Sequence, residues 1–138
     1  MIINIKSVIL SGIIAGMIIM LIGAGLVPII GGQMDEVLKN RLLPPLSNGA
    51  MIYFAFNSIL LGIGAMGFYA LVKTVIKSKI KAIFTAALIF WFFTYFLANA
   101  ALIAYGFMPF ALTVIGTAWG LLEMFSGIIA GSFIYKSK

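Results

Sequence analysis

Long uncharged stretches alternate with short charged segments along the whole chain. Residues 8–30, 51–72 and 82–105 contain no charged side chain, and residues 111–135 contain only Glu123. Because a helix rises about 1.5 Å per residue, each stretch can cross a hydrocarbon core about 30 Å thick. The pattern predicts an all-α membrane protein with four transmembrane helices over these four ranges.

The composition supports a lipid environment for this bundle. Of the 138 residues, 64% are hydrophobic and 9% are charged, whereas about a quarter of the residues of a soluble domain are charged. Each crossing needs about 20 residues, which leaves room for four or five spans. We therefore expect a single transmembrane domain over residues 1–138.

The first stretch has an alternative interpretation as a secretory signal, because Lys6 precedes an apolar run. The apolar core of a signal peptide has about 7 to 15 residues. Here the run continues from Val8 to Ile30, and comparable runs follow it. We expect a helix that is retained in the mature protein.

Basic residues are distributed unevenly between the two ends of such a bundle. One end carries Lys6, Lys73, Lys77, Lys79, Lys81, Lys136 and Lys138. The other end carries only Lys39 and Arg41, accompanied by Asp35 and Glu36. Loops rich in Lys and Arg remain on the cytoplasmic side, so both termini are expected in the cytoplasm. Positive charge at helix ends fits anionic lipid headgroups, and we expect no nucleic-acid partner.

The outer loop, residues 33–49, has room for structure of its own. Apolar residues recur in it at helical spacing until the Pro44-Pro45 pair, at Met34, Val37, Leu38 and Leu42. This spacing predicts a short interfacial helix. An external lid or a partner-docking loop is the alternative, and the sequence does not separate the two.

Several kinds of chemistry lack the residues they need. The chain has no Cys and no His, and its Asp and Glu residues number 3. These residue types supply thiolate nucleophiles, imidazole bases, zinc ligands and hard-cation sites. We expect no enzyme activity, no metal centre and no cofactor.

Glu123 is the exception, because it lies near the middle of the last predicted span. An acid at the centre of a span costs about 2.5 to 3.5 kcal/mol on insertion scales, which favours a functional role. The alternative is a neutral side chain that holds two helices together by a hydrogen bond, worth about 0.6 kcal/mol. Because Gln or Ser would do this at lower cost, we favour a site that binds a proton or a cation.

Other polar residues are predicted at a similar depth. Thr94 and Tyr95 lie near the middle of the third span, and Asn57 and Asn99 lie in the outer half of the second and third. Hydrogen bonds between helices are the expected role of the two Asn residues. Tyr95 can donate to an ionised Glu123 or accept from a neutral one, so we predict a small polar site around this pair. Within the aromatic run 90–96, Trp91 and Tyr95 are four residues apart and could line the same interior site.

Small residues form stripes on the first and last spans, and the hexapeptide SGIIAG occurs in both, at residues 11–16 and 126–131. Stripes of this kind allow helices to approach closely. The residues that we assign to helix packing are Gly12, Gly16, Gly23, Gly120, Gly127 and Gly131.

The two stripes predict a specific antiparallel contact. Gly12 should meet Gly131, and Gly16 should meet Gly127. The same register would place Gly23 opposite Gly120, and Met20 opposite Glu123. A close contact between the first and last spans would hold Glu123 in the interior.

The pattern resembles small four-span prokaryotic membrane proteins of unknown function. The resemblance rests on Gly12-Ile-Ile-Ala-Gly-Met17 in the first span, a tryptophan in the third, and Trp119 ahead of Gly127-x-x-x-Gly131 in the fourth. It covers most of the chain and implies a multi-pass protein of a prokaryotic cytoplasmic membrane. It implies no activity.

Two functions remain open at this point. The first is a small proton- or cation-coupled transporter or channel-type protein that uses Glu123, with a homo-oligomer expected because symmetry turns one carboxylate into a pair or ring. The second is an accessory or assembly subunit that docks a larger membrane partner through its glycine-rich helix faces.

Overall fold

The computed structural model describes residues 2–137, and helices make up most of this part of the chain. The elements in chain order are α1 (Ile5–Ala24), α2 (Val27–Asn40), α3 (Asn48–Val75), α4 (Lys79–Trp91), a π-helical segment η1 (Phe92–Phe96), α5 (Leu97–Ala104) and α6 (Phe110–Ile134). Because α4, η1 and α5 follow one another directly, they form one long helix, Lys79–Ala104. The predicted all-helical fold is confirmed for the described residues.

Four helices within residues 2–137 are long and apolar enough to cross a membrane. They are Ile5–Ala24, Asn48–Val75, Lys79–Ala104 and Phe110–Ile134. Each overlaps one of the predicted spans, which confirms their number and order in this part of the chain. The main difference is in the first span, which ends at Ala24 and not near Ile30.

Polar side chains mark where several helices begin. Asn4 accepts a hydrogen bond from the backbone N–H of Ser7 at 3.3 Å. Ser47 accepts from the N–H of Ala50 at 3.2 Å, ahead of α3. Such caps satisfy backbone donors that have no partner within the helix, and they explain why these helices start outside the apolar runs.

A break at residues 25–26 separates α1 from α2. The N–H of Gly25 donates back to Leu21 and Ile22, which closes the end of α1. Pro28 lies in the first turn of α2, a position that tolerates a residue without an N–H. The predicted loop helix therefore exists, but it starts earlier than expected and ends at Asn40, before the prolines.

Two residues with a left-handed backbone conformation follow α2 and α5, at the end of the bundle away from the chain ends. Gly106, with φ of 69°, follows α5, and the N–H of Phe107 donates to Leu102 at 2.9 Å. Leu42 has φ of 56° after α2 and is 94% exposed. Because this φ is not that of an α-helix, Leu42 lies outside the helix that its spacing predicted. The conformation also has a steric cost for leucine that it does not have for glycine.

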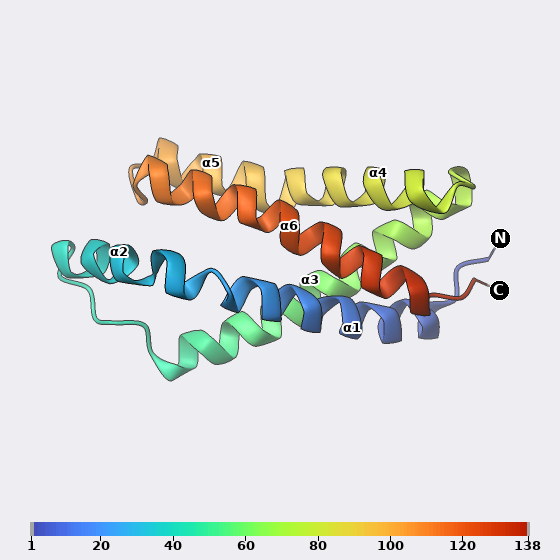
Figure 1. Cartoon of the computed structure of the whole chain (residues 1–138), viewed down its shortest axis with the longest axis horizontal. Coiled ribbons are helices and arrows are strands. Elements are labelled where there is room, and N and C mark those ends of the chain that lie inside the picture. The colour runs from blue at the N-terminus through green and yellow to red at the C-terminus, as the bar shows by residue number, and fades with distance from the viewer. Residues whose placement is uncertain (1, 138) are drawn as a thin grey trace.

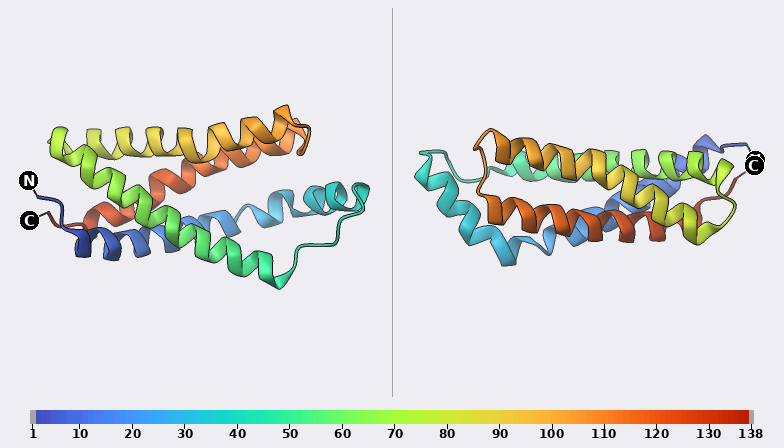
Figure 2. Two further views of the ribbon diagram at one scale, coloured as in Figure 1. Left: turned by 180° about the vertical axis from the view of Figure 1, so that it is seen from behind. Right: turned by 90° about the horizontal axis from the view of Figure 1, so that it is seen from above.

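The helices close together at one end of the bundle and diverge at the other (Figures 1 and 2). α1 and α6 lie side by side in opposite directions, and α3 crosses α1. The long helix α4–η1–α5 lies along α6. Both ends of the described chain lie at the closed end, whereas the start of α3 turns away from α5 and α6 at the opposite end (Figure 1).

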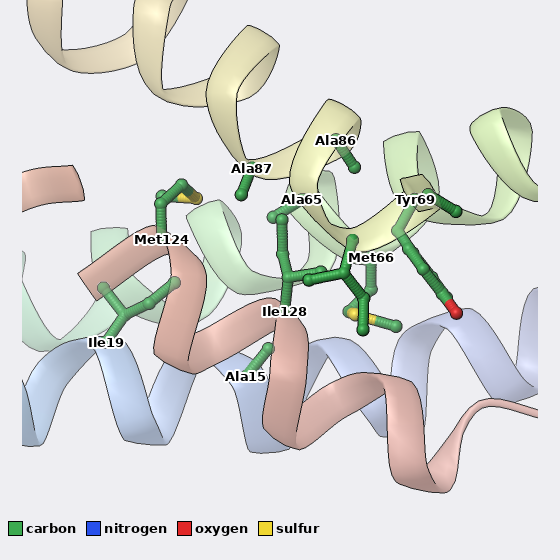
Figure 3. Packing of buried hydrophobic residues seen from close by; sticks show 11 residues of the cluster. Ala15, Ile19, Ala65, Met66, Tyr69, Ala86, Ala87, Met124 and Ile128 are labelled. Carbon is green, nitrogen blue, oxygen red and sulfur yellow. The ribbon is translucent and has the colours of Figure 1, made fainter. Parts of the chain in front are cut away.

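Alanines and larger apolar side chains pack together in the core at the closed end (Figure 3). Ala15, Ala65, Ala86 and Ala87 are fully buried, together with larger residues of α1, α3 and α6 such as Ile19, Met66, Met124 and Ile128. Large apolar side chains such as Leu10, Ile52, Phe93 and Phe133 are instead exposed on the outside. Small residues at the helix contacts, with many bulky apolar side chains on the outside, are expected of helices that pack in lipid.

The predicted register between α1 and α6 is wrong, although the two helices do pack in opposite directions. A Cβ atom added to Gly127 would lie 3.1 Å from the carbonyl oxygen of Ala15, and one added to Gly131 would lie 3.0 Å from that of Ser11. The α6 glycines therefore face Ser11 and Ala15, and not Gly16 and Gly12.

The glycines of α1 contact a different helix. A Cβ atom added to Gly12 would lie 2.5 Å from the Cα of Ile63, and one added to Gly16 would lie 2.6 Å from the Cα of Ile59. A Cβ on Gly62 would overlap the backbone of α1. One face of α1 thus packs against α3, and the neighbouring face packs against α6. The spacing of small residues along α1 does not show which helix each face contacts.

The contacts between α1 and α6 near the middle of the bundle also differ from the predicted register. Gly23 lies next to the carboxylate of Glu123, in the place that the prediction gave to Met20, and a Cβ there would be 3.0 Å from Oε1. Gly120 faces Tyr95, and a Cβ on it would overlap the aromatic ring. Both glycines make room for members of the polar site.

Candidate functional site: a polar cavity around Glu123

Glu123 is an acid in the interior of the bundle. It lies in the middle of α6 and is 6% exposed. The hydroxyl of Tyr95 donates a hydrogen bond to its Oε2. The structure thus brings together the pair that the sequence analysis connected by depth alone.

The π-helical segment positions Tyr95. Within η1 the backbone bonds run from residue i to residue i+5, as in the bond from the N–H of Leu97 to the carbonyl of Phe92. Isolated π turns in α-helices often occur at functional sites. Here the wider turn lies opposite Glu123, and the bare backbone of Gly120 accommodates the Tyr95 ring beside it.

A cavity of about 460 Å³ lies in front of this pair. It is lined by Leu26, Phe54, Asn57, Ser58, Leu61, Thr94, Tyr95, Asn99, Gly116 and Glu123. All the residues predicted for a proton, cation or substrate site are in this set. Apart from Leu26, its lining comes from α3, η1, α5 and α6, so polar residues of three spans meet at the cavity.

Most polar groups of the lining are already bonded within the chain. The hydroxyl of Ser58 donates to the carbonyl of Phe54 at 2.8 Å, and that of Thr94 donates to Phe90 at 2.7 Å. Asn99 donates through Nδ2 to the hydroxyl of Thr117 at 2.8 Å, an interhelical bond of the predicted kind. The Asn57 amide takes part in no such bond within residues 2–137, so it is available to a ligand.

The charge on an ionised Glu123 has no partner nearby. The basic residues among residues 2–137 lie at helix ends or in loops, at Lys6, Lys39, Arg41, Lys73, Lys77, Lys79, Lys81 and Lys136. In a medium of low dielectric constant a lone carboxylate is costly. Glu123 must therefore either carry a proton and be neutral or, when it is ionised, have a cation bound beside it.

The geometry does not suit a chelated metal ion. Within residues 2–137 there is no group of three or more His, Cys, Asp or Glu side chains that could hold one. A calcium ion takes 6–8 oxygen ligands, most of them carboxylates and carbonyls. One carboxylate with amides and hydroxyls is better suited to a singly charged ligand.

The spacing of the aromatic run also allowed Trp91 beside the site, in addition to the residues assigned to it, but Trp91 lies elsewhere. Trp91 is not part of the cavity lining, and its Nε1 donates to the carbonyl of Thr117 at 2.8 Å. The expectation that Trp91 and Tyr95 share one interior face assumed a regular α-helix between them. The π-helical segment starts at Phe92 and changes the angle between the two side chains.

The apolar and small lining residues were missed by the sequence analysis. Leu26, Phe54 and Leu61 look like ordinary residues of a membrane span, and only their place in the fold distinguishes them. Gly116 lies seven residues before Glu123 on the same stripe of small residues, a position that predicts helix packing and not a binding site. Ser58 had a weak signal, because it follows Asn57. Adjacent polar residues in an apolar span would have supported its inclusion.

A hydrogen bond joins the loops at the divergent end of the bundle. Nη2 of Arg41, just after α2, donates to the carbonyl of Gly106 in the turn between α5 and α6 at 2.8 Å. Deeper in the bundle, Nε1 of Trp119 donates to the carbonyl of Ile22 at 2.8 Å, next to the break between α1 and α2. We call residues 22–41, from the end of α1 to the residue after α2, the α1–α2 arm. These side-chain bonds connect the α1–α2 arm to α6 and to the turn between α5 and α6.

Comparison with known proteins gave no match: no family model, curated protein or solved structure matches this chain.

Proposed function

We propose that the protein is a small transporter or channel-type protein of a prokaryotic cytoplasmic membrane, in which Glu123 binds and releases a proton or a monovalent cation. One observation carries the proposal: a buried carboxylate with no basic partner nearby faces a polar-lined cavity. Ionisable groups inside membrane spans commonly mark the path of an ion or proton.

The orientation of the chain in the membrane is part of this proposal. The basic residues of the α3–α4 turn, with Lys6 and Lys136, lie at the same end as both ends of the described chain. The positive-inside rule puts that end in the cytoplasm. The cavity lies toward the opposite end, so we infer that it opens to the outer side of the membrane.

The rival role, an accessory subunit docked through glycine faces, has less support from the geometry. Gly12 and Gly16 contact α3, and Gly127 and Gly131 contact α1 and α3. These faces are occupied within the chain, so a partner would have to use another surface. A homo-oligomer remains compatible with the proposal, since symmetry would bring several copies of Glu123 together.

Flux measurements on reconstituted protein test the proposal. The purified chain is placed in liposomes that contain a pH-sensitive or a potassium-sensitive dye, and the wild type is compared with Glu123→Gln. The matched control is Glu36→Gln, the same substitution at an exposed acid of α2. We expect Glu123→Gln to lower the flux at least tenfold and Glu36→Gln to leave it unchanged.

Two results would contradict the proposal. One is flux that does not differ between Glu123→Gln and the wild type. The other is a wild-type flux no greater than that of empty liposomes under either gradient, with the protein shown to be folded by its circular dichroism.

A further inference from the structure

We propose that the natural ligand of the cavity is an amphipathic organic monocation, with its ammonium group between Glu123 and Phe54 and its hydrocarbon part against Leu26 and Leu61. This inference rests on the proposed function, because it takes Glu123 as the cation-binding group. It adds the chemical class of the substrate.

The size of the cavity is the first argument. Its volume of about 460 Å³ lies within the range of about 300 to 1,000 Å³ that is typical of small-molecule sites. A proton or a bare alkali ion would leave most of this space unfilled. An organic molecule of roughly ten to twenty heavy atoms uses it far better.

The charge of the lining limits the ligand to a single positive charge. Glu123 is the only acid among the lining residues, and no Lys or Arg is among them. One ammonium group neutralises this carboxylate, whereas a second charge on the ligand would remain unpaired in a medium of low dielectric constant. An anionic ligand would meet Glu123 without a compensating cation.

The carboxylate of Glu123 and the ring of Phe54 both line the cavity, and they lie close together because both contact Gly23. A Cβ atom added to Gly23 would lie 2.8 Å from Cζ of Phe54 and 3.0 Å from Oε1 of Glu123. Aromatic rings attract ammonium groups through their quadrupole, and a carboxylate adds ion pairing. The bare backbone of Gly23 leaves the ring and the carboxylate side by side.

The remaining lining is divided between polar and apolar groups. Leu26 and Leu61 supply apolar surface, and Asn57 supplies an amide that is free to bond a polar substituent. A few well-placed polar groups on a mainly apolar wall are typical of sites that bind small organic molecules.

Gly116 provides a way to fill the cavity without disturbing the fold. It lines the cavity from α6, and a Cβ atom added to it would meet no heavy atom within 4 Å. A larger side chain at this position therefore enters the open space. Gly32 in α2 is a matched control, because a Cβ there also meets nothing within 4 Å and Gly32 is not part of the lining.

Binding of benzyltrimethylammonium tests the inference. The full-length protein is incorporated in lipid nanodiscs, and saturable binding is measured by calorimetry against empty discs. Neopentylbenzene, the neutral molecule of the same shape, is measured in parallel. We expect saturable binding of the cation only, with Kd raised at least tenfold by Glu123→Gln and by Gly116→Leu and changed less than twofold by Gly32→Leu and Glu36→Gln.

Folding of the variants is checked by circular dichroism and by elution volume. If Gly116→Leu does not pass this check, Gly116→Ala replaces it, with an expected rise in Kd of about threefold. Three results would overturn the inference: no saturable binding by the wild type, equal binding of the neutral molecule, or a Kd that neither Glu123→Gln nor the filling of the cavity changes.

The outcomes also separate this inference from the proposed function. Glu123-dependent flux of protons or potassium without binding of benzyltrimethylammonium overturns the organic-cation inference and leaves the proposed function in place. Binding that depends on Glu123 and Gly116, without flux of protons, potassium or the organic cation, overturns the transport role and leaves the binding site in place.

Discussion

The two ends of the bundle are built from the same kind of apolar helix but pack in opposite ways. At the end near the termini, the backbones of α1 and α3 touch through Gly12, Gly16 and Gly62. At the other end, α2 and α5 contain no buried residue at all. The small residues determine where the helices close, and the polar residues lie where the helices diverge.

Lipid explains why this difference matters. Hydrocarbon chains are as apolar as leucine, so burying large apolar side chains does little to hold two membrane helices together. Close packing through small residues supplies that attraction at the closed end. The divergent end lacks it and depends on single hydrogen bonds such as those of Arg41 and Trp119.

The largest effect should follow from breaking the closed end. In Gly16→Leu the new side chain meets the Cα of Ile59 and the carbonyl oxygen of Ser58, which belong to the α3 backbone and cannot turn away. We expect the free energy of unfolding to fall by about 3 kcal/mol or more. It can be measured by titration with sodium dodecyl sulfate, followed by circular dichroism.

The control for this prediction is Ile13→Leu, an outward position of the same helix that is 37% exposed. It should change the free energy of unfolding by less than about 0.5 kcal/mol. Equal effects of the two substitutions would show that backbone contact between α1 and α3 does not hold the closed end together.

A smaller effect is expected from the polar pair beside the cavity. Glu123→Leu or Tyr95→Phe alone leaves one partner without its hydrogen bond, which costs about 1 to 3 kcal/mol in a buried place. The double variant removes both partners, so it should be less destabilised than the sum of the two. We expect a coupling energy of about 0.6 to 1.7 kcal/mol, measured by a double-mutant cycle in the same titration.

Strict additivity in this cycle would contradict the prediction. It would mean that the hydrogen bond between Tyr95 and Glu123 contributes nothing to the packing of η1 against α6. The divergent end would then depend less on polar contacts than the structure indicates.

The smallest effect should come from the arm that borders the cavity. Trp119→Phe removes the hydrogen bond to the carbonyl of Ile22, at a cost of about 0.5 to 1.5 kcal/mol. Because this bond lies next to the break between α1 and α2, we expect faster amide hydrogen exchange at residues 27–32. Mass spectrometry of peptides from this segment measures the change.

Trp91→Phe is the matched control for the arm. Its Nε1 also donates to a backbone carbonyl at 2.8 Å, but that carbonyl belongs to Thr117 in α6. It should leave exchange at residues 27–32 unchanged. The same acceleration in both variants would attribute the effect to a general loss of stability and not to the α1–α2 arm.

The sequence was sufficient for the features that depend on one helix at a time. Uncharged runs gave the number and order of the spans, and depth along each span brought Glu123, Tyr95 and Asn99 to the same region. Features that depend on how the helices face one another could not be predicted from the sequence. The register of Gly12 and Gly16 was wrong because α1 offers two neighbouring small faces, and their partners are chosen by the whole bundle.

Local irregularities were the other source of error. The break after Ala24 depends on the backbone bonds of Gly25 and on the contact with Trp119, which lies far away in the sequence. The aromatic residues of 92–96 gave no sign of a π turn, since such residues are equally common in regular membrane helices. In both cases a long-range hydrogen bond lies beside the irregular backbone, from Trp119 to Ile22 and from Tyr95 to Glu123.

The π-helical segment also changes the direction in which the side chains of the third span point, between the part before it and the part after it. Each of its turns takes up one residue more than an α turn, because its bonds join i to i+5 and not i to i+4. The directions of the side chains around the helix axis after Phe96 are therefore rotated relative to those before Phe92. The segment lets Ala86 and Ala87 face the core at one end while Asn99 faces the cavity at the other, so a single helix matches two different neighbours.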